Sequence, residues 1–258
     1  MTQPVTATAA AAPAARRWPV GVIVGIAAAW VVAIGVTAAG KGNLANHDTL
    51  IKGNLPVGAA IVIFLIAWQV MIAAMMLPST LPLLRMFRVA SAKQERPGLM
   101  LLVFVTGYTV VWSLAGCIAL LGDMGVHAIV DAVPALGDRP HLIAGGVLVI
   151  AGAFQFTALK DRCLEQCRHP AMWMLRHYRR GAANAFHLGQ LHGRFCLGCC
   201  WALMLLMFAV GVSNLIWMPA LAALMAYEKI GRRGEEVGKL AGAILLAGGG
   251  VLIGSALY

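Results

Sequence analysis

Apolar residues along this chain fall in blocks separated by short polar segments, and most blocks are long enough to cross a bilayer as an α-helix. The apolar stretch 196–227 would measure about 48 Å as one straight helix, well beyond the roughly 30 Å hydrocarbon core. Because it contains Gly211, Asn214 and Pro219, we predict two shorter helices joined by a tight turn at 212–214. The predicted helices cover residues 18–39, 57–77, 99–121, 142–159, 196–212, 215–228 and 238–257. The expected fold is therefore all-α, a polytopic transmembrane bundle of about seven helices.

Charged residues lie between the apolar blocks, and their distribution predicts an orientation. The chain has 20 Lys and Arg against 10 Asp and Glu. If the N-terminus is cytoplasmic, nearly all basic residues fall in cytoplasmic segments, and Lys41, Lys52 and Arg139 are the exceptions. Membrane proteins keep Lys and Arg on the cytoplasmic side. We therefore expect a multi-pass protein of the bacterial inner membrane with its C-terminus outside, surrounded by lipid and not binding nucleic acid.

The same pattern predicts the domain organisation. Residues 1–17 are small, Ala-rich and end in two arginines, which is typical of a short disordered tail. Residues 18–258 form a single transmembrane helical domain. Within it, residues 160–195 are predicted to be a basic cytoplasmic loop.

Five of the six cysteines are concentrated in two short groups near the expected cytoplasmic helix ends. Cys163 and Cys167 are four residues apart, and Cys196, Cys199 and Cys200 have i, i+3 and i+4 spacing, so each group shares one helix face. The cytosol keeps thiols reduced, which disfavours disulfides there. Thiolates select Cu(I), Zn(II) and similar ions, so the two groups are candidate metal ligands. The remaining cysteine, within residues 99–121, is expected to be a buried apolar residue.

Histidine and methionine extend this candidate site. His192 lies four residues before Cys196 and could join the same face. Met75 and Met76 end the second apolar block, and Met204 follows Cys196 and Cys200 on one face. Thioethers suit Cu(I), so these methionines, with Met218 in the sixth block, could line a path or a secondary site. Core packing is the alternative, because Met commonly fills irregular gaps in helical bundles.

Polar residues near the apolar blocks are weaker candidates. Gln69, Gln155 and Asn214 are expected to hydrogen-bond neighbouring helices. The dipeptide Glu228-Lys229 is predicted to be an interfacial pair, and no acidic residue is expected deep in an apolar block. No P-loop, nucleophile elbow, paired carboxylate or HExxH motif is found, so no catalytic residue is assigned.

Several blocks together resemble a known family. They are residues 68–82 (WQVMIAAMMLPSTLP), 107–112 (GYTVVW), 151–170 (AGAFQFTALKDRCLEQCRHP), 193–207 (GRFCLGCCWALMLLM) and 214–218 (NLIWM), followed by Glu228-Lys229. They are similar to bacterial proteins described as predicted metal-binding integral membrane proteins, otherwise a domain of unknown function. The resemblance covers residues 57–256 approximately. It implies metal binding and supplies no substrate, direction or mechanism.

The leading hypothesis is a membrane protein that binds a soft metal ion, Cu(I) before Zn(II), for transport or delivery. Its partner would be a metal donor or acceptor protein or another membrane subunit. One alternative is a membrane thiol–disulfide oxidoreductase using Cys196 and Cys199, whose two-residue separation matches the redox spacing. A structural or assembly subunit of a membrane complex is the other. The predicted metal ligands are Cys163, Cys167, Cys196, Cys199, Cys200, His192, Met75, Met76 and Met204.

Overall fold

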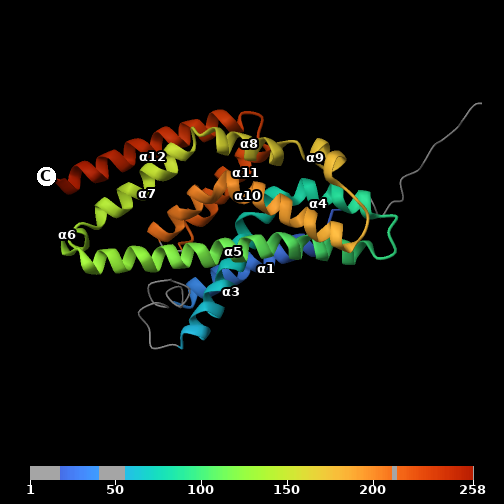
Figure 1. Ribbon diagram of the computed structural model, residues 1–258, viewed down its shortest axis with the longest axis horizontal. Helices are drawn as coiled ribbons and strands as arrows, with labels where there is room; N and C mark the ends of the chain where they lie inside the picture. Colours follow the sequence, from blue (N-terminus) through green and yellow to red (C-terminus); the bar gives the residue numbers. More distant parts are fainter. Residues whose placement is uncertain (1–17, 41–55, 211–213, 258) are drawn as a thin grey trace, which may run out of the picture.

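The computed structural model describes residues 18–40, 56–210 and 214–257, and this part of the chain is all-α, as predicted (Figure 1). The predicted N-terminal tail, 1–17, and residues 212 and 213 of the predicted turn lie outside it. The helices are α1 (Val20–Ala38), α3 (Val57–Met75), α4 (Leu77–Ser91), α5 (Pro97–Ala132), α6 (Pro134–Gly137), α7 (Pro140–Phe154), α8 (Ala158–Arg168), α9 (Pro170–His177), α10 (Ala182–Val210), α11 (Trp217–Ile230) and α12 (Gly234–Leu257).

Five of these helices are long and apolar enough to cross a membrane: α1, α3, α5, α10 and α12. The count becomes six if α7 and α8, which are bent by 63° at their junction, form one broken span. Large apolar side chains are exposed along α1, α5 and α12, where lipid would cover them. Predicted helix 215–228 corresponds to α11, whose 14 residues measure about 21 Å, less than the bilayer core.

Two helix pairs form the frame of the bundle. In Figure 1, α5 runs along the molecule with α10 beside it, and α12 lies along α7. Glycines allow close backbone contact in the first pair, because a Cβ on Gly189 would lie 2.0 Å from the Phe104 carbonyl oxygen. Phe104 lies beside Gly189 and Val111 beside Gly193, so α5 and α10 run in the same direction.

The segment 160–195, predicted to be a basic cytoplasmic loop between membrane helices, is mainly helical. Thr157 caps α8 by accepting a hydrogen bond from the Lys160 backbone N–H at 3.3 Å. Pro170 occupies the first position of α9, where its missing N–H is harmless. α10 begins at Ala182, well before the predicted start at 196. These polar and amphipathic helical segments lack the long apolar run that indicates a membrane helix, so the hydropathy pattern does not predict them.

The second predicted helix, 57–77, is interrupted near its end. α3 ends at Met75, and α4 starts at Leu77 after a break at Met76. Pro78 has no N–H to continue the hydrogen-bond ladder. At the break itself, the Met76 carbonyl accepts hydrogen bonds from the hydroxyls of Ser79 at 2.8 Å and Thr80 at 3.0 Å. The break therefore fixes Met76 and Ser79 at the inner surface of the bundle.

Candidate metal centre

Sulfur atoms gather at the centre of the bundle. Cys196, Cys199 and Cys200 lie on one face of α10, and each is at most 1% exposed. The core that surrounds them contains methionines from α3, the break before α4, α10 and α11: Met71, Met75, Met76, Met204, Met207, Met218 and Met225. The predicted sulfur residues of α3, α10 and α11 are thus in one hydrophobic core.

The two cysteine groups meet at the interface between α8 and α10. Cys167 on α8 lies beside Cys199 on α10, close enough for the two thiols to interact. Gly198 allows Cys163 to approach, because a Cβ at Gly198 would lie 2.6 Å from the Cys163 sulfur. Both α8 cysteines pack against the buried core. Residues separated by more than 30 positions in the sequence therefore converge on one sulfur-rich region.

A thioether adjoins the thiols from a third element. The Cys200 sulfur lies 3.7 Å from the Met76 sulfur at the α3–α4 break. Met75 and Met204 are buried in the same core. Thiol and thioether donors together form the kind of ligand set that Cu(I) favours.

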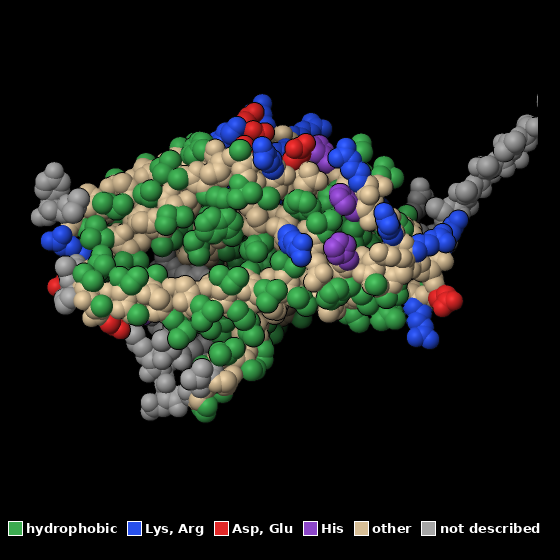
Figure 2. Space-filling model, in the orientation of Figure 1, with side chains coloured by type: hydrophobic (Ala, Val, Ile, Leu, Met, Phe, Trp, Pro, Cys, Tyr) green, Lys and Arg blue, Asp and Glu red, His purple; other side chains and the backbone are tan. Residues whose placement is uncertain are grey.

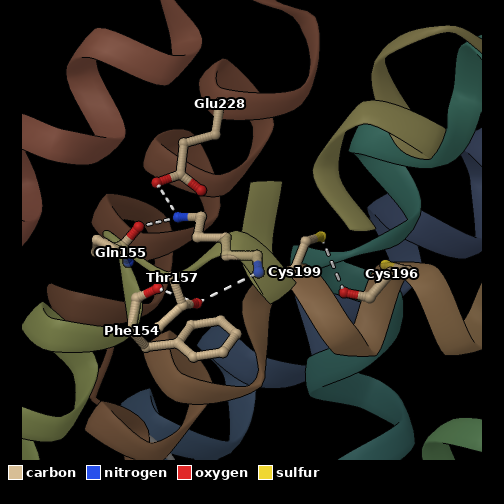
Figure 3. Close-up of polar contacts among 7 residues, drawn as sticks. Phe154, Gln155, Thr157, Cys196, Cys199 and Glu228 are labelled. Carbon is tan, nitrogen blue, oxygen red and sulfur yellow. Dashed lines mark hydrogen bonds and ion pairs between the residues drawn. The ribbon is translucent and has the colours of Figure 1, made fainter. Parts of the chain in front are cut away.

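Two of the α10 thiols are hydrogen-bonded to the helix backbone. Cys199 donates to the Cys196 carbonyl at 3.1 Å (Figure 3). Cys200 donates to the same oxygen at 2.7 Å. All six cysteines are free. Among the described residues, no group of three or more His, Cys, Asp and Glu side chains is arranged to hold a metal ion. Coordination would therefore require the thiols to rotate away from the helix backbone.

His192 lies in an aromatic cluster. Its ring stacks on Tyr108 with centroids 5.8 Å apart and meets Trp173 edge-on at 5.6 Å. The Phe104 ring also lies near His192, with the two ring centroids 6.4 Å apart. The ring is thus packed among aromatic groups, one helical turn before Cys196.

Buried charges were missed by sequence reasoning. Lys160 on α8 and Glu228 on α11 are each 2% exposed and form an ion pair of 2.8 Å. Gln155, a buried residue at the corner between α7 and α8, also accepts a hydrogen bond from the Lys160 ammonium (Figure 3). Glu228 and Lys229, expected to lie at the membrane interface, are both buried within the bundle, and the partner of Glu228 is Lys160.

Lys229 connects this charge network to the sulfurs. Its ammonium lies 3.2 Å from the Cys196 sulfur and donates to the Ser79 hydroxyl at 3.2 Å. The Tyr108 hydroxyl lies 3.2 Å from the same sulfur. Cys196 therefore has two polar neighbours inside an apolar core. The signal in the sequence was weak: two adjacent charges closing an apolar block, with no indication of what they face.

Comparison with known protein families shows which family the chain matches. A family model described as "PpoB2: Copper chaperone" matches residues 65–252, well over half of the chain. The match includes every predicted ligand. No curated protein and no solved structure matches the chain.

Proposed function

Because the chain belongs to the PpoB2 family of copper chaperones, we propose that its buried cysteines receive copper as Cu(I) and release it to an acceptor protein. Copper is here the cargo. The ligands proposed are the thiolates of Cys163, Cys167, Cys196, Cys199 and Cys200, with Met76 as a thioether donor. Met75, Met204 and Met218 would line the route, and His192 would support Cys196 through packing.

The observation that carries this proposal is the meeting of the two cysteine groups across the α8–α10 interface. A site shared by two helices can change its coordination when the helices shift, whereas a site within one helix is fixed by its spacing. Multiple soft donors also permit ligand-by-ligand exchange with an incoming thiolate. Both features favour transfer of the ion.

Replacing Gly198 with Ala tests the role of this interface. The added methyl would overlap the Cys163 sulfur, and overpacking costs about 1–3 kcal/mol. We expect Cu(I) affinity to fall about 10- to 100-fold, measured in detergent by competition with a chromogenic Cu(I) chelator. Zn(II), the second ion expected from the sequence, serves as the competing metal.

Gly250→Ala is the matched control. Gly250 lies on α12, and a Cβ added there meets no neighbouring atom within 4 Å. This variant should bind copper like the parent protein. Equal affinity in the Gly198 and Gly250 variants would mean that α8 contributes no ligand.

We further propose that the chain crosses a bacterial inner membrane seven times, with α11 as the short sixth crossing and the N-terminus inside. The helix directions support this order. α5 and α10 run in the same direction, while Gly145 faces Gly249 and Gly152 faces Gly242, so α7 and α12 run in opposite directions.

Basic side chains on the visible face gather over α8 and α9 in Figure 2. An acceptor protein would approach this basic end.

A reporter enzyme fused after residue 258 tests the orientation. Alkaline phosphatase requires the oxidising periplasm to form its disulfides, so it should be active at the C-terminus. A fusion in the 178–181 segment between α9 and α10 should be inactive. The opposite pair of results would invert the proposed orientation.

A further inference from the structure

Three side chains that carry formal charge are buried in the described part of the chain: Lys160, Glu228 and Lys229. Lys160 and Glu228 neutralise each other across 2.8 Å. Lys229 forms no ion pair with a carboxylate in the described ranges, and its ammonium contacts the Ser79 hydroxyl and the Cys196 sulfur. With all thiols protonated, the interior therefore carries one excess positive charge.

An isolated ammonium in an apolar interior is costly unless an anion accompanies it. Cu(I) bound by two thiolates supplies one: the ion replaces two thiol protons, which leave to solvent, and the complex has a charge of −1. We propose that Lys229 is the built-in counter-ion of a Cu(I)–bis-thiolate complex that includes Cys196. The proposal rests on the proposed function, and it assigns a role to Lys229, a residue that does not itself bind the metal.

The surroundings of Cys196 support its place in that complex. Its sulfur has the Lys229 ammonium and the Tyr108 hydroxyl at 3.2 Å each. An anionic sulfur can accept hydrogen bonds from both groups, and such charge-assisted bonds are stronger than neutral ones. The second thiolate comes from the neighbouring thiols, while the Met76 thioether can bind without altering the charge.

This charge balance also affects whether the site prefers a monovalent or a divalent metal ion. A divalent ion with two thiolates is neutral, which leaves Lys229 uncompensated. Zn(II) needs three thiolates to reach the balance that Cu(I) reaches with two. A fixed positive charge beside a site of few thiolates therefore favours the monovalent ion.

Lys229→Met tests the proposal, because Met has similar length and no charge. We expect Cu(I) affinity at least about 30-fold lower than in the parent protein, measured by chelator competition in detergent. Lys229→Gln keeps a hydrogen-bond donor without the charge and should show the same loss. Lys229→Arg should retain most of the affinity. Lys239→Met, which removes an exposed ammonium paired with Glu235 on α12, should leave the affinity unchanged.

A second substitution separates charge from shape. In Cys196→Met a thioether replaces a thiolate, so the copper complex becomes neutral and leaves Lys229 uncompensated. Combining it with Lys229→Met removes both charges. The double variant should therefore bind Cu(I) at least about tenfold more tightly than the product of the two single effects predicts.

The outcomes are distinct. Parent-like Cu(I) affinity in folded Lys229→Met and Lys229→Gln would overturn the counter-ion role and leave the copper site intact. The same conclusion would follow if the affinity losses of the two single variants simply multiply in the double variant. A parent protein that binds no Cu(I) would overturn the proposed function itself. Thermal unfolding of each variant in detergent establishes that it is folded.

Discussion

Replacing Cys196, Cys199 and Cys200 together with Ser will abolish copper retention. A hydroxyl oxygen is a poor ligand for Cu(I), which prefers sulfur. Removing one group that only hydrogen-bonds a metal ligand already weakens metal binding about 10- to 100-fold. Removing three ligands should therefore lower the Cu(I) affinity by more than about 100-fold. Elemental mass spectrometry of protein purified under reducing conditions should give on the order of one copper per parent chain and almost none in the variant.

Two further variants make this result specific. Cys117→Ser alters the half-buried cysteine on α5, away from the sulfur cluster, and should retain copper. Cys163→Ser combined with Cys167→Ser removes only the α8 thiols and should give an intermediate affinity. Full retention in the triple variant would place the copper elsewhere.

Replacing Glu228 with Gln will strongly destabilise the protein. Lys160 is buried, and the substitution leaves its ammonium without a counter-charge. Breaking a buried pair in this way costs about 3–5 kcal/mol, whereas the pair itself need not stabilise the fold. We expect a markedly lower thermal unfolding temperature in detergent. We also expect easier proteolysis of α8, because the ion pair of Lys160 links α8 to α11.

Glu236→Gln is the control for this prediction. Glu236 is 75% exposed and lies 3.9 Å from Arg233, so its loss should change the unfolding free energy by less than about 1 kcal/mol. Lys160→Met combined with Glu228→Leu removes both charges and should be more stable than Glu228→Gln alone. Equal stability of the Glu228 and Glu236 variants would contradict the role given to the buried pair.

The hydrophobic pattern was sufficient to predict an all-α fold with several helices long enough to cross a membrane, because bilayer thickness sets a minimum apolar length that few other structures reach. It placed α1 and α12 to within a few residues. Helical spacing also predicted which face of α10 carries its thiols. The family description independently supports copper as the ion, which the concentration of thiols and methionines had favoured.

The sequence did not predict what depends on contacts between distant segments. Lys160 and Glu228 are 68 positions apart, and no periodicity relates them. The length of α10 depends on packing of its polar first half against α5. Adjacent charges at the end of an apolar block usually face headgroups or water, so Lys229 gave no sign of its sulfur neighbour.

X-ray absorption at the copper edge of the Cu(I)-loaded protein tests the central claim most directly, because it reports the atoms bound to the metal. We predict a first shell made only of sulfur, with a lower sulfur count in the Cys196/Cys199/Cys200→Ser variant if any copper remains. A first shell of nitrogen or oxygen, or an identical spectrum in parent and variant, would contradict copper binding by the thiols between α8 and α10.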